Sequence, residues 1–250
     1  MGRVKIKRKS TLIDMTAMSD VTVLLLTFFM LTSTFLQKEP VTVKTPSSVS
    51  QLAVPASNLV TVLVDPEQHV FISITGAESM PSDTVRMEVL KRAVSTYNKL
   101  HKSNPVNLNE QQVKSFAALN MFGCPIAKLP EFLSLTPQEQ DLALKPNAKD
   151  PNNYAGIPID GRKEFQSNPN EFQIWMQAYQ DVSQDIKCTV EKPDGTLDPD
   201  GTAYDLLRQG KVIALKADGT TPYSVVHLVM DNLQTMKMTR FTLMTSLKNE

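Results

Sequence analysis

Residues 21–37, VTVLLLTFFMLTSTFLQ, contain no charged side chain and decide the first element of the fold. A helix of these 17 residues is about 25 Å long, which is shorter than the roughly 30 Å hydrocarbon layer of a membrane. The sequence Lys-Glu-Pro at 38–40 closes its C-terminal end, so the helix reaches about 20 residues only if it begins near Thr16. The sequence therefore predicts a membrane helix over 13–37 that includes Asp20.

Two acidic residues lie within this span, Asp14 near its start and Asp20 about two turns further in. A carboxylate in the hydrocarbon costs about 2.5 to 3.5 kcal/mol on insertion scales, and membrane proteins retain such groups mainly in ion pathways and proton relays. Asp20 is therefore a candidate proton carrier. An alternative interpretation places Asp20 in the headgroup layer, solvated and favoured by the helix dipole. Asp14, six residues further out, fits that alternative better.

Asp20, Thr27 and Thr34 are spaced by seven residues. On an α-helix each is rotated only about 20° from the last, so they form one polar stripe along an apolar span. Hydroxyls that face another helix can bond across the contact, which predicts a dimer face or a proton path along this stripe. Threonine can also bond the backbone of its own helix, and that alternative remains open.

The charges on either side of the apolar run predict its orientation. Two basic residues follow the run, Lys38 and Lys44, whereas five precede it: Arg3, Lys5, Lys7, Arg8 and Lys9. The positive-inside rule then places residues 1–12 in the cytoplasm, Asp14 and Thr16 at the cytoplasmic side, and the remainder in the periplasm. A cleaved signal peptide is the alternative, but the apolar run is long, an acid stands at its start, and no small-residue cleavage pattern follows.

The exported part carries no sign of nucleic-acid binding. The whole chain has 26 basic and 26 acidic residues, and removing the cationic tail leaves the remainder mildly acidic. Its two cysteines, Cys124 and Cys188, lie where oxidising conditions permit a disulfide, although both are equally compatible with small buried thiols.

The exported part begins with an extended linker over 38–57, rich in proline and serine. Alternating β-rich runs on either side of an Asp-Pro turn predict a hairpin over 59–74. Capping residues and apolar periodicity predict further elements. These are helices over 82–101, 109–122, from 136, 170–186 and 221–236, and strands over 212–216 and 240–245, with a strand over 41–44 also possible.

Two blocks of the sequence resemble the ExbD/TolR family of biopolymer-transport proteins. The first is IDMTAMSDVTVLLLTFFMLTS at 13–33, and the second is VIALKADGTTPYSVVHLVMDNLQTMKMTRFTLMTS at 212–246. SNLVTVLVDPEQHVFISI at 57–74 is similar to the family's first hairpin, though less closely. The chain departs from the family at Ala17, where proline is usual, and in residues 77–210, which have no counterpart in compact members.

The resemblance implies a single-pass membrane protein, with one transmembrane helix followed by an α+β periplasmic domain over 58–250. In that domain a small sheet carries helices on one face. Residues 77–210 are expected to form a mostly helical insertion with a small core of its own. The family implies no function for that insertion.

The resemblance also implies a role in energy conversion, with Asp20 as the proton carrier. ExbD-like helices form a homodimer inside an oligomeric ExbB-like channel in the bacterial inner membrane. Proton passage there drives motion that a TonB-like or Tol-system partner receives. Protons are the coupling ion, and no cofactor is expected. A proton falling through 100 mV releases about 2.3 kcal/mol, enough to bias one mechanical step.

Three alternatives remain open at this point. The apolar run also resembles the membrane segment of MotB-type flagellar stators, although the block at 212–246 favours ExbD. A gliding or secretion motor subunit would use the same mechanism. In a different class, the chain would be a membrane-tethered binding module in which Asp20 carries no proton.

An enzyme is not expected. The three histidines, His69, His101 and His227, show no metal-ligand spacing, and no phosphate-binding glycine loop or nucleophile elbow is present. Asp198–Gly201 is read as a turn rather than a calcium loop, because the full ligand register is missing. No catalytic or metal-binding residue is therefore predicted.

Overall fold

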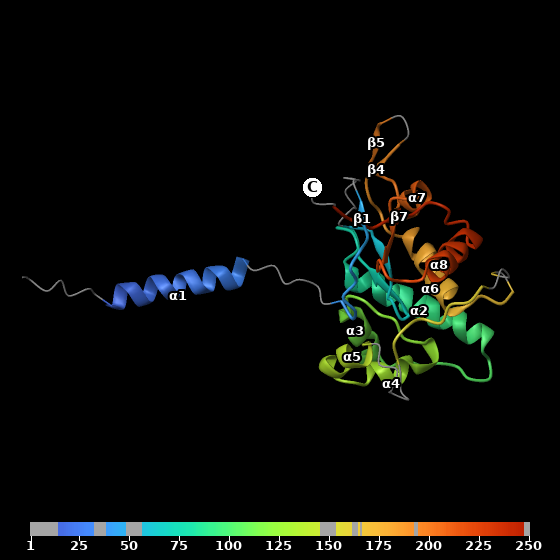
Figure 1. Cartoon of the computed structure of the whole chain (residues 1–250), viewed down its shortest axis with the longest axis horizontal. Helices are drawn as coiled ribbons and strands as arrows, with labels where there is room; N and C mark the ends of the chain where they lie inside the picture. The colour runs from blue at the N-terminus through green and yellow to red at the C-terminus, as the bar shows by residue number, and fades with distance from the viewer. Residues whose placement is uncertain are drawn as a thin grey trace, which may run out of the picture. The chain divides into compact units, whose positions relative to one another are not determined.

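The computed structural model describes residues 15–32, 39–48, 57–145, 154–161, 165, 167–192 and 195–247. The chain divides into two compact units, residues 1–38 and residues 39–250. The first unit contains helix α1 (Met15–Thr32), and the second is an α/β domain whose helices and some of whose strands are labelled in Figure 1.

The domain is built on a mixed four-stranded sheet in the order β3-β2-β6-β7. Strands β2 (Val60–Val64) and β3 (Val70–Ile74) form the predicted antiparallel hairpin, while β6 (Ile213–Ala217) pairs parallel to β2 and β7 (Thr242–Leu243) parallel to β6. Two short additional pairs are β1 (Ser47–Ser48) with β8 (Ser246–Leu247) and β4 (Val190–Glu191) with β5 (Leu197–Asp198).

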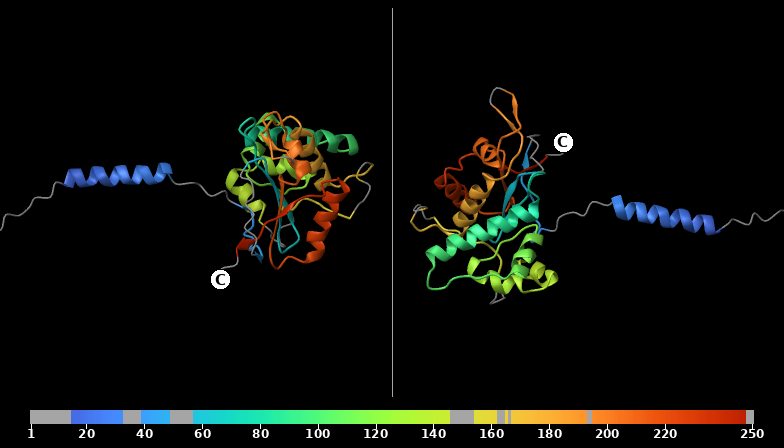
Figure 2. Two further views of the ribbon diagram at one scale, coloured as in Figure 1. Left: turned by 90° about the horizontal axis from the view of Figure 1, so that it is seen from above. Right: turned by 180° about the vertical axis from the view of Figure 1, so that it is seen from behind.

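Seven α-helices of the described domain accompany this sheet. Their bounds are α2 (Ser82–Leu100), α3 (Glu110–Ala118), α4 (Leu129–Leu133), α5 (Pro137–Ala143), α6 (Glu171–Ser183), α7 (Ala203–Gln209) and α8 (Tyr223–Thr235), with a 3-10 turn at Ile126–Lys128. Figure 2 shows α2 and α6 packed side by side. The predicted capping box of α5 is confirmed, because the Thr136 side chain accepts from the Glu139 N–H and Glu139 accepts from the Thr136 N–H.

The register of the sheet identifies which elements cover each face. Phe122 pairs with Ile72 through two backbone hydrogen bonds of 2.8 and 2.9 Å, so both side chains point to one face. The Phe122 ring packs against Trp175 of α6 and Phe116 of α3, with centroids 4.7 and 4.8 Å away. Helices α3 and α6 therefore lie on this face of the sheet.

Residues 77–210 do not build a separate core, contrary to the sequence-based expectation. Trp175, Phe116 and Phe122 belong to one continuous buried cluster that also contains Val62 of β2 and Leu215 of β6. Phe122 also adds one residue of backbone pairing to the outer edge of β3. The apolar face of the sheet is therefore completed by side chains from within this segment.

The two ends of residues 77–210 do lie close together. Asn58 donates its backbone N–H to Gly76, and Val60 donates to Val212, at 3.0 and 2.8 Å. Both ends of this segment thus lie beside the start of β2. Ends that lie close together are expected for a segment inserted into a domain.

Three elements considered from the sequence differ from the structure. The helix predicted over 109–122 ends at Ala118, because residues 119–122 leave it to pair with β3. The closing strand predicted over 240–245 contains only Thr242–Leu243. The strand considered over 41–44 is absent from the described linker, where pairing occurs at Ser47–Ser48 instead.

Candidate functional site

Asp20 lies within α1 rather than at its cap. Five residues of helix precede it from Met15, so it is about 7.5 Å along the axis from the first described residue. The described helix is 18 residues long, or about 27 Å, and is long and apolar enough to cross a membrane. Asp14 lies outside the described residues.

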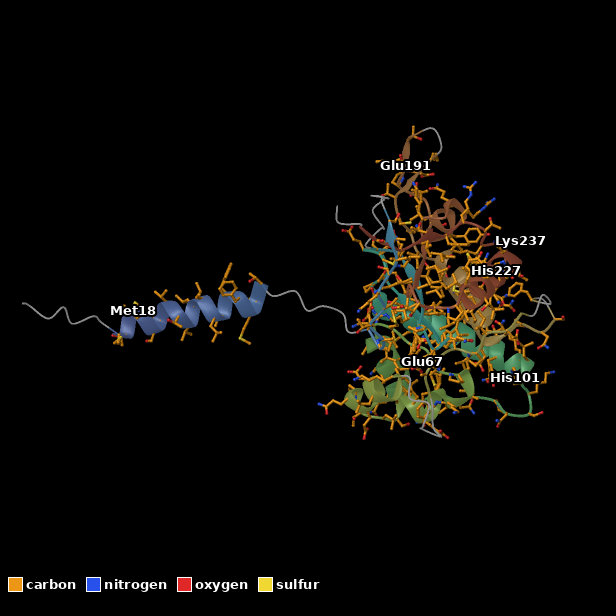
Figure 3. All side chains as sticks on the ribbon, in the orientation of Figure 1. Met18, Glu67, His101, Glu191, His227 and Lys237 are labelled. Carbon is orange, nitrogen blue, oxygen red and sulfur yellow. The ribbon has the colours of Figure 1, made fainter. Side chains whose placement is uncertain are left out.

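The apolar side chains of α1 are exposed. Leu24, Phe28 and Leu31 are 61%, 60% and 86% exposed, and none of the residues of this helix is buried. Figure 3 shows the side chains of α1, including Met18, projecting from the ribbon on opposite sides. A helix with apolar side chains exposed over most of its surface needs a lipid or protein environment, because water would solvate that surface poorly. Asp20 is its only acidic residue.

The hydroxyl groups of α1 bond to their own helix. Thr27 donates to the Leu24 carbonyl at 2.9 Å, Thr22 to Met18 at 2.7 Å, and Ser19 to Thr16 at 2.9 Å. Thr16, Asp20 and Thr27 share one face, since offsets of four and seven residues return to nearly the same direction. Thr34 lies outside the described residues. The Asp20 carboxyl group, by contrast, makes no such hydrogen bond to the backbone of the described helix.

A second polar cluster lies in the domain, where Asp218 follows β6. One carboxylate oxygen of Asp218 accepts from the Thr220 N–H and hydroxyl at 2.9 and 2.6 Å, while the other accepts from the Lys44 N–H at 2.7 Å. Hydrogen bonds from Thr220, and then the one from Lys44, hold the pKa of Asp218 below its usual value. Residues 217–220 (Ala-Asp-Gly-Thr) thus form a turn, and the Asp218 carboxylate in this turn binds the backbone of the linker at Lys44.

The linker is fixed at two further points. Gly219 donates its N–H to the Lys44 carbonyl at 2.9 Å, and the Lys216 ammonium contacts the Glu39 carboxylate at 2.6 Å. Lys216 is opposite Leu63 in the sheet, so its side chain points away from the face that carries Phe122 and α6. Residues 39–44 therefore lie over the sheet face opposite the helices. These contacts could not be predicted from the sequence, because partners 174 and 177 residues apart leave no local signal.

Helices α6 and α8 are joined by a buried amide network. The Asn232 carbonyl oxygen on α8 accepts from Asn170 at 2.8 Å and from Gln173 at 2.9 Å, while its amide donates to the carbonyls of Asp160 and Leu228. All three amide side chains are buried, and each of these bonds offsets part of the cost of their desolvation. The network holds α8 against α6.

The histidines and cysteines do not form a reactive centre. His69 bonds Asp65 at 2.9 Å in the hairpin turn, and no group of three metal-ligating side chains occurs within the described ranges. The considered disulfide is not formed, since Cys124 and Cys188 are free thiols. Cys124 is buried and Cys188 is half-buried, and burial raises the pKa of both thiols.

The comparisons with known proteins give one match. The family model described as biopolymer transport protein ExbD/TolR matches residues 7–121. The matched range contains α1, the β2–β3 hairpin, α2 and α3, and it ends before residues 212–246. It also continues past residue 77, where the predicted insertion begins. No curated protein and no solved structure matches the chain.

Proposed function

We propose that this chain, an ExbD/TolR family protein by its match over residues 7–121, is the ExbD-like subunit of a proton-driven motor. In this proposal α1 spans the bacterial inner membrane with its N-terminus in the cytoplasm, and the domain is periplasmic. The motor energises transport across the outer membrane through a TonB-like partner. Family membership supports a subunit that energises biopolymer transport and works with ExbB- or TolQ-type partners.

The position of Asp20 carries the proposal. It is the single acidic side chain on a helix whose apolar residues are exposed on all sides, so it has no partner within α1. Two copies of α1 inside an ExbB-like channel would cover this apolar surface and place Asp20 at the contact between helix and channel wall. The carboxyl group would be neutral against apolar walls and would release its proton to water on the other side. The membrane potential gives that transfer a direction.

Asp20→Asn tests the proton role. The amide keeps the shape of the side chain but cannot carry a proton, so we expect assembly with the channel subunit to persist while energy-dependent uptake is abolished. The measurement is uptake of a receptor-bound cargo by the native host, together with co-purification of the channel subunit. Asp200→Asn is the matched control, because Asp200 is exposed in a turn of the domain. Near-normal uptake by Asp20→Asn at matched expression would favour the tethered binding module instead.

The family match does not separate an ExbD role from a TolR role. Deleting the gene distinguishes them: loss of uptake of receptor-bound cargo supports a TonB-type partner, whereas leakage of periplasmic proteins with normal uptake supports a Tol-type partner. In both cases the proton step at Asp20 is the same.

A further inference from the structure

A groove of about 580 Å³ runs along α2 in the domain. Leu90 and Val94 of α2 line one side, and Val106, Leu108 and Val113 of the following segment line the other. Leu90 and Val106 are buried, and the other three are half-buried. The groove therefore has an apolar floor that remains partly accessible to solvent.

Hydrogen bonds hold the second wall in place. The Asn98 side chain donates to the Val106 carbonyl at 2.8 Å and accepts from the Val106 N–H at 2.7 Å, which fixes this backbone against α2. Beyond it, Asn109 and Gln112 form the capping box that begins α3. A wall fixed in this way loses little conformational entropy when a ligand binds.

The rim of the groove carries lysines near both ends. Lys91 stands beside one end and Lys99 and Lys102 beside the other, near His101, which Figure 3 labels. The Lys91 ammonium contacts Glu88 at 2.8 Å, whereas neither Lys99 nor Lys102 has an acidic partner among the described residues. From Leu90 to Lys99 the helix rises about 14 Å, which matches two to three helical turns or four to five extended residues.

We propose that this groove binds a peptide segment of a partner protein in which apolar residues are accompanied by carboxylates. The apolar residues would contact Leu90, Val94 and Leu108, and the carboxylates would pair with Lys99 and Lys102. Such complementary charge gives specificity and a faster association rate. The proposal is independent of proton transfer at Asp20.

Two other occupants fit the groove less well. A fatty acid brings a single carboxylate, whereas two lysines without an acidic partner among the described residues, Lys99 and Lys102, line the same end of the groove. A membrane surface is flat on this scale and would not reach an apolar floor that lies between two walls. A peptide distributes its charges along its length and enters a concave site.

The test uses the full chain in nanodiscs of zwitterionic lipid and a fluorescein-labelled nine-residue peptide in which leucine alternates with glutamate. We expect its fluorescence anisotropy to rise on binding, and the affinity to fall as salt is raised, because ion pairs are screened. The charge reversal Lys99→Glu/Lys102→Glu should weaken binding at least tenfold. Both lysines are exposed, so circular dichroism should show an unchanged fold.

Lys187→Glu/Lys237→Glu is the matched control. These two lysines are exposed outside the groove, and Figure 3 shows Lys237 on another part of the domain from His101. This variant should bind the peptide as the wild type does. Equal binding of a peptide with lysine in place of glutamate, equal weakening in both charge-reversal variants, or displacement of the peptide by micromolar dodecanoate would overturn the proposal.

Discussion

At the scale of single residues, the polar side chains of α1 differ in whether the helix itself provides their hydrogen-bond partner. Thr22 and Thr27 donate their hydroxyl protons to the α1 backbone, which leaves each hydroxyl oxygen able to accept a hydrogen bond from a partner. Asp20 has no such bond, and in the proposed function it is the residue of α1 that the channel subunit would accommodate. The sequence was sufficient to single out Asp20, because a lone acid in an apolar run is visible without a structure.

His69 provides a residue-scale prediction in the hairpin turn. Asp65 accepts the His69 backbone N–H at 2.6 Å and contacts the ring at 2.9 Å, and the ring bond to Asp65 is the main reason that the pKa of His69 is raised. A histidine with a raised folded pKa adds stability that is fully present below its unfolded pKa of about 6.5, and loses it as pH rises through the folded pKa.

We therefore expect His69→Gln to lower the free energy of unfolding by about 1 kcal/mol at pH 5.5 and by clearly less at pH 9. Urea unfolding of the full chain in detergent at both pH values measures this difference. His227→Gln is the control, because its contact with Asp231 lies between half-exposed side chains that solvent screens. An equal loss at both pH values would assign the effect to packing instead.

At the scale of elements, hydrophobic periodicity located the hairpin, α2, α6 and α8 to within a few residues. It missed α7, although Thr202 and Asp205 form a capping box and Gly210 ends the helix in the left-handed conformation with a φ of 81°. Both signals are local and could have been used. The early end of α3 could not be predicted, because it follows from pairing between Phe122 and β3, 50 residues earlier in the chain.

The faces of α1 give an element-scale prediction. Thr27 lies near the direction of Asp20, whereas Thr22 is about 200° away around the helix. Valine has nearly the volume of threonine, so Thr27→Val should reduce energy-dependent uptake severalfold while Thr22→Val leaves it near wild type. Both hydroxyls bond the helix backbone in the same way, which makes Thr22 a matched control. Equal loss in the two variants would contradict the proposed inner face of the helix.

At the scale of the whole molecule, the contacts that tie the domain together connect residues distant in sequence. The linker is held by Asp218 and Lys216, and α8 is held to α6 by Asn232 and Gln173. Composition and periodicity describe neighbours along the chain, so they predicted the elements but not these contacts. For the same reason they suggested a separate core for residues 77–210, whose side chains instead complete the core of the sheet.

The shared core gives a prediction that uses the single tryptophan of the chain. Trp175 lies in α6 within residues 77–210, and Val62 lies in β2, outside that segment. Val62→Ala removes two buried methyl groups and should cost about 2 kcal/mol. If residues 77–210 and the sheet unfold as one unit, the urea midpoint measured by Trp175 fluorescence should fall. The expected fall is the lost free energy of unfolding divided by the m value.

Thr239→Ala, an exposed substitution, should leave that midpoint unchanged. In Val62→Ala, the Trp175 midpoint could instead stay constant while circular dichroism shows a second transition at lower urea. That result would mean that residues 77–210 fold independently. Coincident shifts of both signals would mean instead that this segment cannot be removed without unfolding the sheet, because the rings of Phe116, Phe122 and Trp175 cover its apolar face.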